Sequence, residues 1–119
     1  MLQPRSDVAS VRRWLSEHGW RPVSERLVET RRRLHLTIAA EPGDDAEVYR
    51  DPTLGRDDLF AAGPLLVRAA GPELALLLRS EKGRLEAILA RPGSGAAKAR
   101  ARFDLDRTLR LIAAISRRA

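Results

Sequence analysis

The sequence predicts a small α/β protein in which one helix and an antiparallel strand pair precede an antiparallel coiled-coil helical hairpin. Three observations lead to this prediction. Apolar residues recur at helical spacing in residues 8–15, alternate with polar ones in 33–40, and recur at spacings of four and three in 74–88. A chain of 119 residues is long enough for one domain and too short for two.

Residues 1–42 are expected to hold the helix and the strand pair. The helix can end at Gly19, because glycine tolerates the left-handed conformation that closes many helices. Its apolar face is expected to carry Val8, Val11, Trp14 and Leu15. Two strands follow over 20–29 and 34–40, with a turn of three arginines between them at 31–33. Such closely spaced strands are expected to pair as a hairpin.

Residues 43–71 are expected to be a linker around a short helical turn. Proline, glycine and aspartate gather between residues 41 and 55, as they do in surface loops. Residues 57–62 can form the helical turn, and Gly-Pro pairs interrupt the chain at 63–64 and 71–72.

Residues 72–119 are expected to form the helical hairpin. The first helix carries a seam with one polar interruption, made by Leu74, Leu78, Glu81, Leu85 and Ile88. The sequence RPGSG at 91–95 predicts the turn, and a second helix is expected over about 96–117. The face of that helix expected to pack on the first consists of Ala101, Leu105, Leu109 and Ile112.

Positive charge is concentrated in the last third of the chain. The sequence has 22 basic and 16 acidic residues, a net charge of +6, and residues 79–119 alone contribute +7. The outer face of the last helix is expected to carry an arginine stripe, formed by Arg100, Arg107, Arg110, Arg117 and Arg118. Only Asp104 and Asp106 accompany these arginines in sequence, which favours a contact with nucleic acid over an ordinary solvated face.

Catalytic and metal-binding patterns are absent from the sequence. It has no cysteine, no glycine-rich phosphate loop and no Ser-His-Asp arrangement, and its two histidines have no second metal ligand nearby. No cofactor-binding or metal-ligating residue is therefore expected. The sequence also has neither a signal peptide nor an apolar run of membrane-spanning length, so a cytoplasmic protein is expected.

Short motifs in a fixed order resemble the C-terminal half of the bacterial tRNA (adenine(22)-N(1))-methyltransferase family. They are LQP at 2–4, VRRWL at 11–15, GW at 19–20, ERLVE at 25–29, IAAE at 38–41 and GPLL at 63–66. The resemblance implies that residues 1–42 are the C-terminal remnant of a Rossmann-type methyltransferase sheet, in which residues 2–4 end a strand that precedes the helix and the strand pair. It also implies that Gln3 and Pro4 border the reaction site, although Arg5 stands where the family usually has asparagine.

In this family an N-terminal domain binds S-adenosylmethionine and a C-terminal helical hairpin helps to hold tRNA. The glycine-rich cofactor loop would precede Met1, so the resemblance implies a misassigned start, a gene fragment or one half of a split enzyme. The implied partners are tRNA and a missing or separate N-terminal methyltransferase half. S-adenosylmethionine is not expected to bind this chain alone.

The leading hypothesis is therefore the C-terminal portion of a tRNA N1-adenine methyltransferase that binds and orients tRNA. Two alternatives remain. One is a non-catalytic RNA-binding module that keeps the helical hairpin. The other is a structural hairpin that dimerises through its heptad residues, with its charge serving only solubility: Leu74, Leu78, Leu85 and Ile88.

Overall fold

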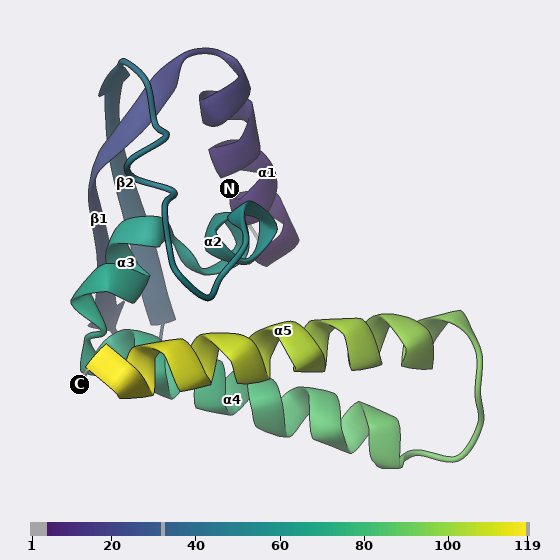
Figure 1. Ribbon diagram of the computed structural model, residues 1–119. Coiled ribbons are helices and arrows are strands. Elements are labelled where there is room, and N and C mark those ends of the chain that lie inside the picture. Colours follow the sequence, from purple (N-terminus) through teal and green to yellow (C-terminus); the bar gives the residue numbers. More distant parts are fainter. Residues whose placement is uncertain (1–4, 32, 119) are drawn as a thin grey trace.

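The computed structural model describes residues 5–31 and 33–118 (Figure 1). This part of the chain forms, in order, α1 (Arg5–Glu17), β1 (Trp20–Thr30), β2 (Arg33–Pro42), α2 (Arg56–Ala62), α3 (Pro64–Ala69), α4 (Pro72–Ala90) and α5 (Ala96–Arg118). The predicted first helix, strand pair, short helical turn and two long helices occur in this order, whereas α3 was not predicted. The strand end implied at residues 2–4 lies outside the described residues. Helices α1, α2 and α3 lie beside the strand pair, and α4 and α5 extend away from it as a separate arm (Figure 1).

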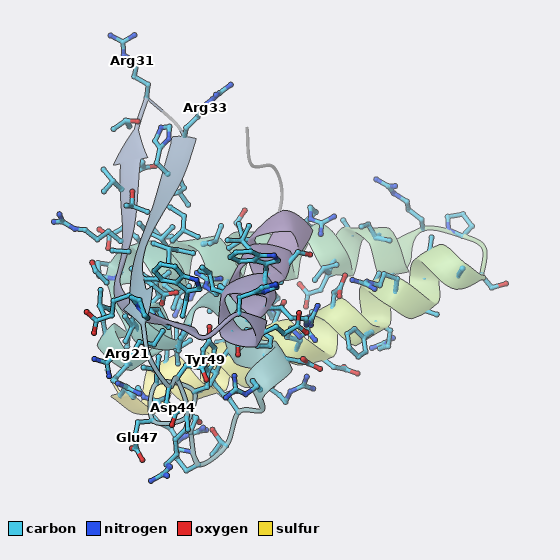
Figure 2. The ribbon with its side chains drawn as sticks, turned by 90° about the horizontal axis from the view of Figure 1, so that it is seen from above. Arg21, Arg31, Arg33, Asp44, Glu47 and Tyr49 are labelled. Atoms are coloured by element: carbon cyan, nitrogen blue, oxygen red, sulfur yellow. The ribbon has the colours of Figure 1, made fainter. Side chains whose placement is uncertain are left out.

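Strands β1 and β2 form the antiparallel hairpin that the alternating pattern predicts. Leu27 pairs with Leu36, and Glu25 pairs with Ile38, so these side chains share the face that turns toward the helices. Leu27 packs against the main hydrophobic core. The far end of the hairpin projects beyond the helices, as the positions of Arg31 and Arg33 in Figure 2 show.

A buried ion pair joins α1, β1 and the junction between α2 and α3. The Arg12 Nε donates to Glu25 Oε2 at 2.8 Å, and Arg12 Nη1 donates to the carbonyl of Phe60 at 2.8 Å. Glu25 Oε1 accepts the backbone N–H groups of Leu65 and Leu66, which begin α3. Both charged side chains are almost fully buried. The pair therefore supplies polar contacts at the point where three elements meet.

Gly63 permits the close approach at this junction. Its φ is +99°, a region that residues with a Cβ rarely adopt. A Cβ placed there would lie 2.6 Å from Arg12 Nη2 and 2.9 Å from Glu25 Oε1. Glycine is thus required both by the backbone conformation and by the ion pair beside it.

The main core connects the loop after β2 with α2, α3 and both long helices. Its buried members include Tyr49, Phe60, Val67, Leu74 and Ile115. The segment 43–71, expected as a linker, therefore contributes large side chains to the same core as the helical hairpin. The ring of Tyr49 meets that of Phe60 edge to face, with 5.0 Å between centroids.

Helices α4 and α5 run antiparallel and pack side by side, joined by the turn at 91–95 (Figure 1). The predicted seam of α4 is buried at Leu74, Leu78, Glu81 and Leu85. The expectation for Leu109 is wrong, because its side chain is 43% exposed while Thr108 and Leu111 are buried. The second half of α5 also packs on α2 and α3, so its buried face is set by three neighbours instead of one.

Candidate nucleic-acid interface

Arg107 and Arg110 of α5 converge on one carboxylate of α2. Arg107 Nε donates to Asp58 Oδ1 at 3.1 Å, and Arg110 donates to both oxygens of Asp58 at 2.9 and 3.0 Å. Asp58 is buried, at 6% exposure. Two guanidinium groups thus share one buried carboxylate, which holds both side chains in place. Asp106 on α5 also acts electrostatically on Arg110.

The ionisation of Asp58 follows from this arrangement. Burial opposes the charged form of the carboxyl, but the hydrogen bonds and charges of Arg110 and Arg107 outweigh it and hold the pKa of Asp58 below its usual range. The same contact raises the pKa of Arg110 further above neutrality. Asp58 and Arg110 are therefore both charged at neutral pH.

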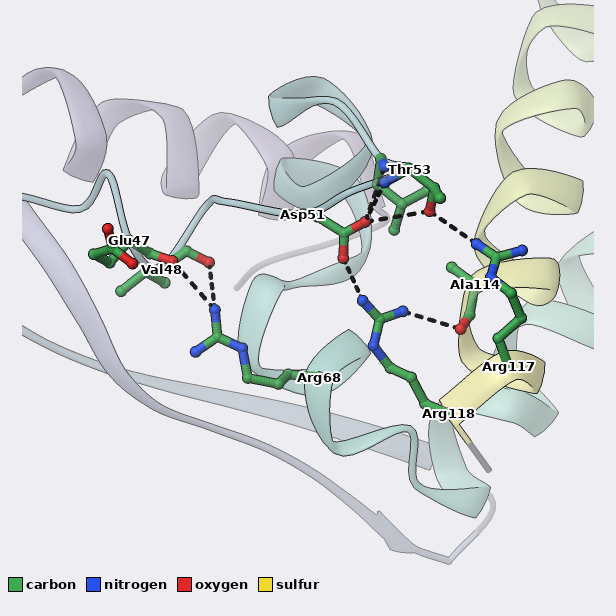
Figure 3. Close-up of polar contacts among 9 residues, drawn as sticks. Glu47, Val48, Asp51, Thr53, Arg68, Ala114, Arg117 and Arg118 are labelled. Carbon is green, nitrogen blue, oxygen red and sulfur yellow. Dashed lines mark hydrogen bonds and ion pairs between the residues drawn. The ribbon is translucent and has the colours of Figure 1, made fainter.

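Arg117 and Arg118, at the end of α5, contact the loop that precedes α2 (Figure 3). Arg118 pairs with Asp51 and donates to the carbonyl of Ala114 at 2.9 Å. Arg117 donates to the hydroxyl of Thr53 at 2.8 Å. Burial opposes ionisation of Asp51, but the N–H groups of Thr53 and Leu54 and the charge of Arg118 lower its pKa. These arginines thus attach the loop to α5.

Arg100 lies apart from the other four, in the first turns of α5. Its side chain is 69% exposed and its Nε lies 3.3 Å from Asp104 Oδ2, one turn along the same helix. An exposed pair of this kind contributes little to stability. The first turns of α5 lie in the part of the helical arm that is far from the strand pair (Figure 1).

Phe103 is a candidate contact that the charge pattern did not identify. Half of its side chain is exposed, and it lies between two guanidinium groups, with the Cζ of Arg107 at 4.9 Å and that of Arg100 at 5.9 Å from the ring centroid. An exposed aromatic ring flanked by arginines can stack on a nucleobase while the arginines meet phosphates. The signal in the sequence was its spacing of three from Arg100 and four from Arg107.

The expectation that few carboxylates accompany the arginine stripe is wrong. The acidic partners of the stripe are not only Asp104 and Asp106, because Asp51 and Asp58 reach it from distant parts of the sequence. The five predicted RNA-binding arginines form three separate groups, at Arg100, at Asp58 and at the loop.

Gln3 and Pro4, predicted to border the reaction site, lie outside the residues that the structure describes. Within residues 5–31 and 33–118 no group of three or more His, Cys, Asp or Glu side chains could hold a metal ion. None of the helices in that part of the chain is long and apolar enough to span a membrane.

Comparison with known proteins shows which solved structures share this fold. No protein-family model matches the chain, and no curated protein is significantly similar in sequence. Among solved structures, the Bacillus subtilis tRNA (m1A22) methyltransferase TrmK is similar over 90% of this chain, with a TM-score of 0.72 and 18% sequence identity. The chain has the fold of part of a tRNA (m1A22) methyltransferase. It matches 47% of the TrmK chain, so it spans about half the length of that protein.

The same fold occurs in Sp1610 of Streptococcus pneumoniae, a candidate tRNA (m1A22) methyltransferase. One structure of Sp1610 has a TM-score of 0.64 at 19% identity and covers 92% of this chain. A second, in complex with S-adenosyl-L-methionine, has a TM-score of 0.62 at 19% identity. This chain covers 44% of Sp1610 in both comparisons. The resemblance to the tRNA (m1A22) methyltransferase family, first indicated by short motifs, is confirmed in the fold.

Proposed function

We propose that this chain is the C-terminal, tRNA-binding portion of a tRNA N1-adenine methyltransferase. The observation that carries the proposal is the similarity of its fold to TrmK over 90% of its length. The exposed arginines and Phe103 on α5 agree with a role in holding RNA. The proposed complement is an N-terminal methyltransferase half, either on the same polypeptide or on a separate one.

The proposed reaction depends on holding the substrate in position. The N1 of neutral adenine carries its own lone pair, so methylation needs alignment of the reacting atoms more than a strong base. N1 lies on the Watson–Crick edge, so the base must be unpaired or flipped out to be reached. This chain would contribute by binding phosphates around the target and thereby fixing the orientation of the tRNA.

We expect the described residues not to bind S-adenosylmethionine by themselves. Both described strands are antiparallel, whereas cofactors of this class bind at the carboxyl ends of parallel strands. A groove between β1 and the start of α4 has a volume of about 230 Å³, below the roughly 300 Å³ at which small-molecule sites begin. The cofactor is therefore assigned to the proposed N-terminal half.

The structure argues against dimerisation through the heptad residues. Leu74, Leu78 and Leu85 are at most 6% exposed within a single chain, because α5 and the core already cover them. A dimer that used these side chains would first have to open the helical hairpin. The RNA-binding alternative uses the same surface as the leading proposal and differs only in whether methyl transfer depends on the chain.

The RNA-binding part of the proposal is tested by fluorescence anisotropy with a labelled, unmodified tRNA and the full chain. If about three arginines contact phosphates, affinity should fall roughly 40-fold between about 50 and 200 mM salt. The variant that combines Arg100→Gln with Phe103→Ala should bind more weakly, and Arg50→Gln, an exposed loop variant, serves as the control. Absence of salt-dependent tRNA binding would contradict the proposal.

The methyltransferase part is tested in cells. Deletion of the coding sequence should remove N1-methyladenosine from tRNA, as measured by mass spectrometry of digested tRNA, and a copy of the gene should restore it. If the amount of N1-methyladenosine stays the same while the chain binds tRNA in vitro, the non-catalytic RNA-binding module is the correct function.

A further inference from the structure

The end of the β-hairpin carries positive charge that nothing in the described structure neutralises. Arg31 and Arg33 are exposed and extend away from the helices (Figure 2). Within residues 5–31 and 33–118 neither side chain has an acidic partner or a hydrogen bond. Arg31 adopts a positive φ of 43°, which forms the tight turn. The arginines at this end thus remain available to an external anion.

The charge continues along one face of the hairpin. Pairing in the sheet puts Arg26 opposite Thr37, Val28 opposite His35, and Thr30 opposite Arg33. Residues that face each other in an antiparallel pair lie on the same side of the sheet, so these six form one face. Their side chains are exposed, in contrast to those of Leu27 and Leu36 on the helix side.

No carboxylate lies on that outer face between Arg26 and Thr37. The acidic residues of this part of β1 are Glu25 and Glu29, and alternation along the strand puts both on the helix side. Glu25 is also bound to Arg12. Between Arg26 and Thr37 the outer face therefore presents arginines and polar groups without a compensating negative charge, unlike the second half of α5. Farther from the tip, Glu41 pairs with Arg21.

The dimensions of the face suit a nucleic-acid backbone. Arg26 and Arg31 are five residues apart, which is roughly 16 Å along a strand and several nucleotides at about 3.4 Å per nucleotide. Guanidinium groups bind phosphate oxygens with two parallel hydrogen bonds. Val28, which is 47% exposed, adds an apolar surface between them.

We propose that the outer face and tip of the β-hairpin are a second RNA-binding surface, in which Arg26, Arg31 and Arg33 bind backbone phosphates. The identity of the ligand rests on the proposed function, but the surface is separate from α5 and makes its own contribution. In a tRNA complex the helical arm and the hairpin would contact different stretches of the RNA backbone. The two contacts together would raise the affinity and fix the orientation of the RNA.

The test uses the full chain with Arg26→Gln, Arg31→Gln and Arg33→Gln combined. Two labelled RNAs serve as probes, an unmodified tRNA and a single-stranded uridine oligomer, and anisotropy is measured over a series of salt concentrations. We expect at least tenfold weaker binding to tRNA and a salt slope reduced by about 0.9 for each lost contact. Circular dichroism of the variant should match that of the parent, and Arg50→Gln should bind as the parent does.

The outcomes distinguish failure of the hairpin surface from failure of the proposed function. If the parent binds tRNA and the triple variant binds equally well, the hairpin surface is wrong and the proposed function stands; the face then serves another class of partner, such as an acidic protein surface. If only the hairpin variant loses affinity, and the α5 variant does not, the hairpin surface is supported and the role of α5 is wrong. If the parent binds neither RNA, both proposals are wrong.

Discussion

Two arginine-rich regions of this chain use the same residue type in opposite ways. In the second half of α5, Arg107, Arg110 and Arg118 pair with carboxylates of α2 and the preceding loop. At the tip of the hairpin, Arg31 and Arg33 have no acidic partner among the described residues. The first region uses arginine to hold elements together, and the second leaves it facing solvent.

The difference teaches that a count of arginines along a sequence does not measure the charge available to a ligand. The pairs of α5 join residues 49 to 67 positions apart, so no local window contains both partners. Conversely, the hairpin lies in the part of the sequence with net negative charge, yet strand pairing puts Arg26 and Arg33 on a face that has no carboxylate between Arg26 and Thr37. The availability of an arginine is therefore a property of the fold.

The largest effect on stability is expected at Glu25, which forms a buried ion pair with Arg12. Glu25→Gln should lower the free energy of unfolding by about 3 kcal/mol, because it leaves the Arg12 guanidinium buried without an opposite charge. Urea unfolding measures this, with Glu29→Gln on the exposed part of the same strand as the control. Equal stabilities of the two variants would mean that the ion pair does not hold α1 and β1 to the junction.

A smaller loss of stability is expected when Asp58 is replaced, together with tighter binding of tRNA. Asp58→Asn should cost about 2 kcal/mol, the range for hydrogen bonds to charged groups, because Arg107 and Arg110 lose their shared partner. The released arginines should then bind tRNA more tightly and with a steeper salt dependence. Asp57→Asn, an exposed neighbour, is the control. If the Asp58→Asn variant is fully folded and binds tRNA more weakly than the parent, these arginines act in RNA binding only when they are paired with Asp58.

Acid should loosen the paired region. The pKa values of Asp51 and Asp58 are lowered in the folded chain, because arginine and backbone hydrogen bonds outweigh the opposing effect of burial. Their stabilisation is fully present above the pKa of unfolded aspartate, about 3.9, and is lost as the pH falls through the lower folded values. The melting temperature should thus stay level from neutral pH to about pH 5 and fall below about pH 4. Asp58→Asn should reduce that fall, and an unchanged acid profile would contradict the assignment.

The smallest effect on stability is expected at the hairpin tip. Arg31→Gln and Arg33→Gln should each change the free energy of unfolding by less than about 0.5 kcal/mol, because the exposed side chains make no contact that folding requires. Thermal and urea unfolding provide the measurement. A loss as large as that of Asp58→Asn would reveal a structural role for these arginines and remove the contrast between the two regions.

Much of the fold could be predicted because it is encoded over short distances in the sequence. Leu34, Leu36 and Ile38 alternate with polar residues and lie in β2, and the Gly-Pro pairs mark the starts of α3 and α4. The candidate site was predicted less well. Leu109 was assigned to the wrong face of α5, and Phe103 was not identified, because both depend on which neighbours the helix meets.

The sequence by itself therefore determined which segments are helices and strands, where they turn, and which family their order resembles. These properties depend on backbone conformation and on periodicity within a few turns of chain. Only the tertiary structure decided that residues 43–71 contribute to the core and that Asp58 and Asp51 bind the arginines of α5. It also decided that the outer face of the hairpin has no carboxylate between Arg26 and Thr37. The physical reason is that charge pairing and burial are set by distance in space, and packing brings together groups that are dozens of residues apart.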